Sequence, residues 1–234
     1  MSTLLFREDA YAAECAAAVV LVDARGIQLD RTVFYAAGGG QPGDSGVLRS
    51  AAGDIPIANT IKGDGPESII HVPAPGSRTP STGEAVTAAI DWARRYRLMR
   101  FHTALHLLCS IVPGGVTGGS IGEDKARLDF DVATDSLDKE AIQIRLNALI
   151  AASRPVVSRW IAEDELAARP ELVRTMSVKP PSGQGQVRLL DIEGVDLQPC
   201  GGTHVKNTAE IGRVAVTKIE NKGRQNRRII IGLL

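Results

Sequence analysis

Aromatic residues are scarce in this sequence of 234 residues: tryptophan, tyrosine and phenylalanine together make up 4% of it. A core with so few rings must be packed mainly by valine, isoleucine, leucine and alanine. An excess of charge of one sign is also missing, because 27 basic and 27 acidic side chains give a formal net charge of zero. This balance excludes tight binding to nucleic acid through bulk charge alone, although it leaves room for a local basic patch.

Cysteines and long apolar runs are equally scarce. Only Cys15, Cys109 and Cys200 are present, and three cysteines so far apart exclude a disulfide framework and fit a reducing cytoplasm. No run is long and apolar enough to span a bilayer, and the first residues lack a signal-peptide pattern. With 44% hydrophobic and 23% charged residues, the composition predicts a soluble, cytoplasmic protein with one large domain or two modest ones.

The first ninety residues are typical of a small β domain. Glycine and proline separate short apolar runs, which cover residues 13–24, 27–35, 55–61, 69–72 and 85–90. The break at Arg25-Gly26 between the first two runs predicts a hairpin. A glycine-dense loop occupies residues 38–46. Short strands at this spacing predict a small barrel or sandwich over residues 1–90.

The remaining residues, 91–234, mix helical and strand patterns. Residues 92–112 carry apolar side chains at helical spacing, and residues 136–153 form an amphipathic pattern that Ser136 is expected to cap. A short helix is expected at residues 163–168. Strands are expected at residues 127–132, 156–161, 187–192, 211–219 and 228–233. The second domain is therefore predicted to be α+β.

Three of the four histidines lie in two short motifs, H-T-A-L-H and C-G-G-T-H. His102 and His106 are four residues apart, which places both imidazoles on one face of the predicted helix. Cys200 and His204 have the same spacing, but the two glycines between them predict a loop that approaches from another direction. One cysteine and three histidines suit zinc far better than calcium or magnesium. We therefore predict one zinc ion per chain.

A purely structural zinc is the alternative, because four protein ligands normally close a structural site while catalytic zinc keeps one position open. The helix also lacks the glutamate that follows the first histidine in many metalloproteases, which disfavours a peptidase. Among the remaining residues of interest, His71 is expected at the surface near a strand end. Cys15 and Cys109 are expected to be small core residues.

Six segments resemble the AlaX family, freestanding relatives of the alanyl-tRNA synthetase editing domain. They are LDRTVFYAAGGGQPGDSG (29–46), RLMRFHTALHLL (97–108), DKARLDF (124–130), PCGGTHV (199–205), TAEIG (208–212) and ENKGRQNRR (220–228). The N-terminal part is similar to the medium-length AlaX type. The resemblance implies a small β-barrel followed by an α+β editing domain like the second additional domain of threonyl- and alanyl-tRNA synthetases. It leaves no segment for an aminoacylation domain.

The resemblance implies a zinc-dependent aminoacyl-tRNA deacylase, a carboxylic ester hydrolase that acts in trans on mischarged Ser-tRNA(Ala) and in some members on Gly-tRNA(Ala). Such proofreading is needed because an alanine site cannot strongly reject serine or glycine. The expected partner is aminoacylated tRNA(Ala), with no membrane and no obligate protein partner. The expected catalytic group is a zinc-bound water, and no protein base is assigned. A non-catalytic tRNA-binding module with structural zinc, and a hydrolase for another misacylated tRNA, are the alternatives.

The resemblance also implies substrate contacts. Thr117 falls where the family places a polar side chain that reads the serine hydroxyl, although it can equally be a polar loop residue. The glycine loop lacks the spacing and lysine of a P-loop, and the resemblance directs it toward the editing pocket. The contacts expected from it are Gly39, Gly40, Gln41 and Asp44. The alternative for this loop is a tight β connection.

Two basic clusters are expected to meet tRNA phosphates. The first contains Arg94, Arg95, Arg97 and Arg100, of which Arg94 and Arg95 are the expected contacts. The second contains Lys222, Arg224, Arg227 and Arg228, all four of which are expected contacts. The alternative for each cluster is a solvated face. Zero net charge predicts modest, salt-sensitive tRNA affinity.

Overall fold

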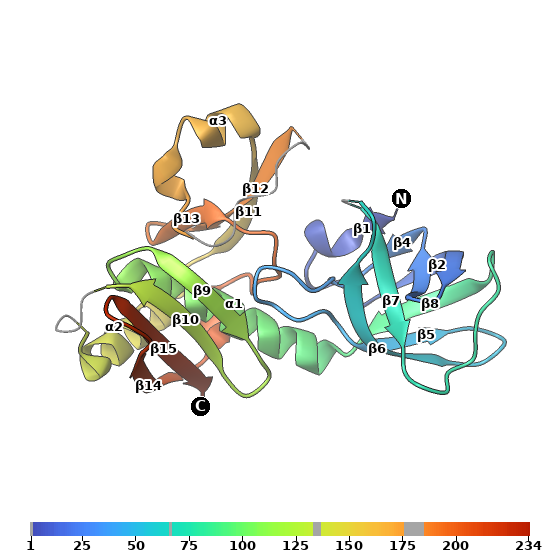
Figure 1. Cartoon of the computed structure of the whole chain (residues 1–234), viewed down its shortest axis with the longest axis horizontal. Helices are drawn as coiled ribbons and strands as arrows, with labels where there is room; N and C mark the ends of the chain where they lie inside the picture. Colours follow the sequence, from blue (N-terminus) through green and yellow to red (C-terminus); the bar gives the residue numbers. More distant parts are fainter. Residues whose placement is uncertain (1, 66, 133–136, 176–184) are drawn as a thin grey trace. The chain divides into compact units, whose positions relative to one another are not determined.

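A computed structural model describes residues 2–65, 67–132, 137–175 and 185–234 of the chain (Figure 1). The chain divides into two compact units, Met1–Arg97 and Leu98–Leu234. This division falls inside helix α1 (Trp92–Ile111), whereas the boundary expected from the sequence, between residues 90 and 91, precedes that helix.

The first unit is a closed barrel of six strands in the order β2-β3-β7-β6-β5-β8. Its strands are β2 (Glu14–Asp23), β3 (Gly26–Leu29), β5 (Gly46–Arg49), β6 (Ile55–Lys62), β7 (Ile69–Pro73) and β8 (Ala85–Ile90). Outside it, β1 (Thr3–Leu4) pairs with β4 (Arg31–Thr32) and leads into the turn η1 (Leu5–Arg7). The buried side chains of Ile27, Leu48 and Ile55 belong to the apolar cluster of this barrel. The predicted small β-barrel is thus confirmed.

The barrel also contains His71, a histidine that was expected at the surface. His71 on β7 is 0% exposed, because β7 is paired with β3 on one side and β6 on the other. Its Nδ1 atom lies 3.0 Å from the Ile27 carbonyl oxygen and its Nε2 atom 2.8 Å from Thr32 Oγ1. Burial lowers the pKa of His71 to about 4, against the opposite effect of the Ile27 hydrogen bond. The expectation of a surface histidine is therefore wrong.

The second unit contains a four-stranded antiparallel sheet in the order β14-β15-β10-β9. The strands are β9 (Val116–Ile121), β10 (Ala126–Asp131), β14 (Val214–Asn221) and β15 (Asn226–Leu233). Helix α2 (Lys139–Ala151) buries Ile142, Leu146 and Ile150 and is fastened to β14 by Asn147, whose Nδ2 atom donates to the Val214 carbonyl at 2.8 Å. Asp138 caps this helix by accepting from two backbone amides; the expected cap, Ser136, lies outside the described residues.

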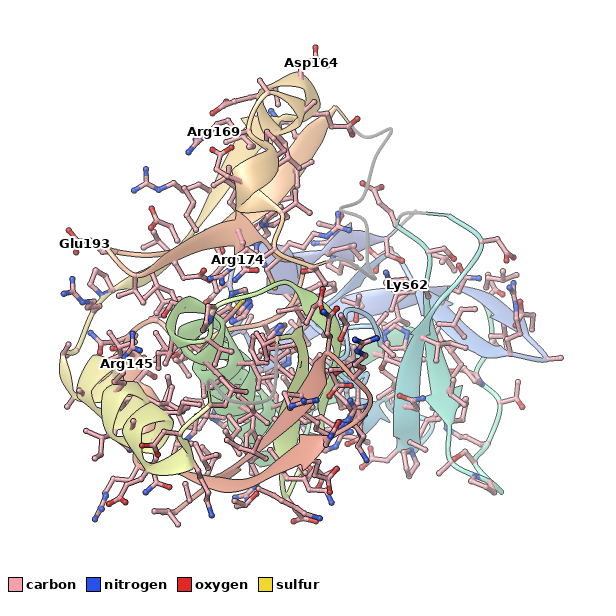
Figure 2. All side chains as sticks on the ribbon, turned by 60° about the vertical axis from the view of Figure 1, so that its left-hand side comes forward. Lys62, Arg145, Asp164, Arg169, Arg174 and Glu193 are labelled. Carbon is pink, nitrogen blue, oxygen red and sulfur yellow. The ribbon has the colours of Figure 1, made fainter. Side chains whose placement is uncertain are left out.

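A second, three-stranded sheet in the order β11-β12-β13 completes the unit. It consists of β11 (Val156–Ala162), β12 (Gln186–Ile192) and β13 (Asp196–Pro199), with α3 (Glu163–Ala167) and the turns η3 (Pro170–Leu172) and η4 (Thr208–Ile211) nearby in sequence. Leu166 of α3 and Leu172 of η3 pack with Val187 and Leu189 of β12. Asp164 extends outward from α3, and Glu193 lies at the turn after β12 (Figure 2). Barrel, sheets and few helices confirm the predicted α+β class.

Candidate metal centre

Helix α1 positions the first two candidate ligands. His102 and His106 lie one turn apart, both buried, with imidazole centroids 5.4 Å apart. Leu98, Phe101 and Leu105 around them are buried apolar side chains, so the two imidazoles lie on a helix fixed by packing. The predicted shared helix face is confirmed.

The loop after β13 carries the other two candidate ligands, Cys200 and His204. The backbone amide of Cys200 donates to the Arg188 carbonyl at 3.1 Å, which extends the pairing of β12 with β13 by one residue. The Arg188 guanidinium donates through Nη1 to the carbonyl oxygens of Cys200 at 3.1 Å and Gly202 at 2.8 Å. A buried arginine thus holds the C-G-G-T-H loop in place, and His204 follows within it.

The four side chains converge on one point. Their nearest ligand atoms all lie within 4.8 Å of one another. Cys200 Sγ is 3.6 Å from His102 Nε2 and 3.2 Å from His204 Nε2. Zinc bonds of ordinary length at a tetrahedral angle would place sulfur and nitrogen about 3.6 Å apart. The donor set and its spacing therefore fit a zinc ion.

Neighbouring side chains fix the tautomers of two of the histidines. His106 Nδ1 lies 2.8 Å from Asp196 Oδ2, and a carboxylate accepts, so this nitrogen carries the proton. The Thr103 hydroxyl donates to the Met99 carbonyl at 3.0 Å, so it accepts from His204 Nδ1 at 3.2 Å. In the neutral form of each ring, Nε2 is therefore the nitrogen available to a metal.

Charge in the cluster favours a cation. Burial alone would raise the pKa of Cys200, but the three histidines lower it well below its usual value. Burial likewise opposes the charged form of His106, yet Cys200 and Asp196 raise the pKa of its imidazole to about 10. Burial and His102 lower the pKa of His204 well below its usual value. A thiolate and a carboxylate at one buried site provide the negative charge that a divalent cation requires.

The sequence analysis missed Asp196, Gln198 and Thr103. Gln198 Nε2 donates to Asp196 Oδ2 at 2.7 Å, the same oxygen that faces His106. The sequence could have indicated Asp196 and Gln198 through their spacing. Residues 196, 198 and 200 are two apart, so on a strand their side chains point to the same face.

Thr117 lies on β9, and its hydroxyl is already engaged. It donates to the Asp129 carbonyl at 3.2 Å and accepts from Asn226 Nδ2 at 3.2 Å. A hydroxyl oxygen has two lone pairs, so these bonds leave one acceptor position. A role for Thr117 in reading serine stays a prediction.

The glycine loop, in the first unit, is a tight β turn at its tip. Gly38 and Gln41 exchange two backbone hydrogen bonds of 3.0 Å each. Gly39 and Gly40 between them have positive φ values of 57° and 82°, as a two-residue hairpin turn of this twist requires. Gly39 and Gly40 are exposed, whereas Gln41 is buried. The tip of the loop thus has the geometry of the tight β connection, and the substrate contacts expected from this loop stay predictions.

Two of the residues expected to contact substrate or tRNA are buried. Asp44 and Arg95 are 1% and 0% exposed and form an ion pair. Asp44 Oδ2 also accepts from the Tyr35 amide at 2.6 Å, and the Arg95 guanidinium donates to the Val33 carbonyl at 2.7 Å. Both charged groups are paired inside the first unit, and contacts of Asp44 with substrate and of Arg95 with phosphate stay predictions.

The second basic cluster is largely paired within its own hairpin and with the neighbouring strand β10. Lys222 forms an ion pair with Glu220 at 2.9 Å, and Arg228 donates to Asp129 at 2.8 Å. Arg227 is buried and donates to the Gly223 carbonyl at 2.7 Å, and its contact with phosphate stays a prediction. Arg224 is exposed. In the first cluster, Arg94 is half-buried and donates to the Gly43 carbonyl at 2.8 Å.

Comparisons with known proteins identify relatives along the entire chain. The alanyl-tRNA editing protein AlaX-M of Methanosarcina acetivorans is 36% identical to it, and the alignment covers all of both chains. The AlaX-M protein of Saccharolobus solfataricus is 33% identical, with 98% of both chains covered. The chain belongs to the AlaX family. The predicted resemblance is thus confirmed.

Models of synthetase domains match parts of this AlaX member. The model for the threonyl and alanyl tRNA synthetase second additional domain matches residues 187–230. The model for class II (A) tRNA synthetases matches residues 6–94. The alanine–tRNA ligase of Pyrobaculum arsenaticum is 34% identical over 92% of this chain, which corresponds to 25% of the ligase. Among the described residues, no helix is long and apolar enough to cross a membrane.

Proposed function

We propose that this chain is a zinc-dependent aminoacyl-tRNA deacylase that hydrolyses mischarged Ser-tRNA(Ala) in trans, with Gly-tRNA(Ala) as a second substrate. The observation that carries the proposal is the convergence of His102, His106, Cys200 and His204 in a chain that aligns end to end with a protein named for alanyl-tRNA editing. One zinc ion per chain accounts for this donor set, which suits neither calcium nor magnesium.

The protein's own contribution is to hold the ligands in a fixed geometry. Zinc, when bound, supplies Lewis acidity that activates water or polarises an ester carbonyl. Asp196 and Thr103 orient His106 and His204, and Arg188 holds the loop that carries Cys200. No side chain is assigned as a general base.

Selectivity for serine is assigned to Thr117. Its hydroxyl proton is donated to the Asp129 carbonyl, so its remaining position accepts from a hydroxyl that donates. The serine side chain offers such a donor, while alanine offers none. A site that hydrogen-bonds a substrate hydroxyl discriminates strongly against an analogue that lacks it, which spares correctly charged Ala-tRNA(Ala).

A tRNA-binding module with structural zinc is the second candidate. It is favoured by one observation: four protein donors converge, and four protein ligands are typical of closed, structural zinc sites. In this case Cys200 would affect folding and tRNA binding, and the chain would hydrolyse nothing.

Deacylation of Ser-, Gly- and Ala-tRNA(Ala) by zinc-loaded protein separates the candidates. We expect hydrolysis of Ser-tRNA(Ala), slow or no hydrolysis of Ala-tRNA(Ala), and loss of activity in Cys200→Ala. Cys15→Ala is the matched control, because Cys15 lies on β2 of the barrel. A folded wild type that hydrolyses none of the three would exclude the proposed function, and equal hydrolysis of Ala-tRNA(Ala) would exclude proofreading.

A further inference from the structure

The side chains on one face of β13 contact the candidate metal centre. Asp196, Gln198 and Cys200 alternate along the chain and therefore point to the same side of the sheet. All three engage the cluster: Cys200 as a candidate ligand, Asp196 through His106, and Gln198 through Asp196. The residue between them, Leu197, packs instead against the apolar cluster beside α3. The metal-facing side of this sheet is thereby identified.

That same face continues across the sheet to Trp160. Trp160 on β11 is directly opposite Arg188 on β12. The Cys200 amide donates to the Arg188 carbonyl at 3.1 Å. Because Leu189 is opposite Pro199, this bond places Arg188 opposite Cys200, one residue further along. Residues directly opposite one another share a face. Trp160, Arg188 and Cys200 thus form one row, about 10 Å from end to end at two strand spacings.

The indole at the outer end of this row is open to solvent. Trp160 is 48% exposed and is the only aromatic among the exposed large hydrophobic residues of the described chain. It lies on β11, which pairs with β12 and is the outer strand of its sheet. Arg188, its neighbour in the row, grips the loop that carries Cys200. A flat apolar surface therefore lies beside the candidate metal centre, in a protein with few aromatic residues.

We infer that Trp160 stacks against the 3′-terminal nucleobase of the aminoacyl-tRNA substrate. The inference rests on the proposed function, because the ester to be hydrolysed is carried by the terminal ribose. The base and ester of that nucleoside are joined through one ribose, so an ester at Cys200 brings its base to the neighbouring surface. Unpaired bases of single strands bind proteins by stacking on aromatic rings. Trp160 would position the terminal nucleoside and leave the chemistry to the metal centre.

Four variants of β11 test this assignment through the kinetics of Ser-tRNA(Ala) deacylation. Stacking on one ring contributes about 1–3 kcal/mol, so Trp160→Ala should lower kcat/KM about 5- to 160-fold, mainly through KM. Trp160→Phe should retain most of the activity, and Trp160→Leu, which keeps apolar area without a ring, should resemble Trp160→Ala. Val157→Ala is the matched control, because Val157 is 45% exposed and lies on the opposite face of the same strand.

A binding measurement keeps the inference independent of catalysis. Uncharged tRNA ending in CCA should quench the Trp160 fluorescence, measured as the difference between wild type and Trp160→Phe, and tRNA lacking the terminal adenosine should quench it much less. If the wild type quenches in this way but hydrolyses nothing, the proposed function fails while the stacking assignment stands.

Equal quenching by the two tRNAs, or kinetics of Trp160→Ala equal to those of Val157→Ala, would overturn the assignment. So would a Trp160→Ala variant that abolishes self-association in sedimentation while binding tRNA normally, because β11 would then serve a second copy of the chain.

Discussion

Removal of the Asp196 carboxylate should weaken zinc binding without removing a ligand. Asp196 Oδ2 receives two hydrogen bonds, from His106 Nδ1 at 2.8 Å and from Gln198 Nε2 at 2.7 Å. Asp196→Ala leaves the imidazole free to turn and to change tautomer, and removes a negative charge next to the cation. Loss of such a partner typically costs 10- to 100-fold in metal affinity, or about 1.4–2.7 kcal/mol. Asp196→Asn keeps an acceptor oxygen and loses only the charge, so we expect an intermediate affinity.

Competition with a chromogenic chelator at constant pH measures this affinity. Asp191→Ala is the matched control, because it removes a carboxylate from β12 that pairs with the exposed Arg159 at 2.7 Å, on the face away from the metal. Thermal unfolding of the metal-free proteins checks that the variants are folded. If Asp196→Ala binds zinc as tightly as Asp191→Ala, the reasoning about His106 is refuted.

Three further predictions follow from the same contacts and from the barrel. Thr117→Val should slow hydrolysis of Ser-tRNA(Ala) about two- to tenfold, the value of one neutral hydrogen bond, and leave Gly-tRNA(Ala) unaffected; an unchanged serine rate would remove Thr117 from the site. His71, with a folded pKa of about 4 below the usual 6.5, binds its proton more readily in the unfolded chain. Its contribution to stability is therefore complete above pH 6.5 and is lost as the pH falls toward 4, by about 2–3 kcal/mol between pH 7 and 4.5. Urea unfolding of wild type and His71→Gln at several pH values measures this, and parallel pH profiles would contradict it. Finally, zinc titration should show a larger loss of affinity in His106→Ala than in His204→Ala, and equal losses would contradict the unequal support described below.

The four candidate metal ligands could be predicted from the sequence because the two members of each pair lie four residues apart. Four-residue spacing on a helix and a glycine-flanked cysteine are readable within a dozen residues. The contacts around the ligands were not readable, because Asp196 lies 90 residues from the histidine that it orients. Only the pairing of β12 with β13 shows which residues share a face with Cys200.

The residues that are buried although the sequence indicated exposure share one cause. A run of arginines is usually a solvated face, but Arg95 finds Asp44 at a separation of 51 residues and both become buried. His71 lies near the end of the short apolar run 69–72, and it is enclosed because β7 is paired with a strand on each side. In each case the residue is polar, and polar residues are usually exposed. The burial was decided by a partner distant in sequence, which no local pattern encodes.

The unequal surroundings of two candidate ligands bear on whether the zinc is structural or catalytic. His106 is carried by a helix fixed by packing and faces a carboxylate, which strengthens it as a ligand. His204 is carried by a loop that contains two adjacent glycines, and its partner is the neutral hydroxyl of Thr103. A structural zinc site is stabilised by four firmly held ligands. A catalytic zinc site requires one coordination position for water or substrate. The asymmetry supports the proposed catalytic assignment, in which His204 would be the ligand that makes way for substrate.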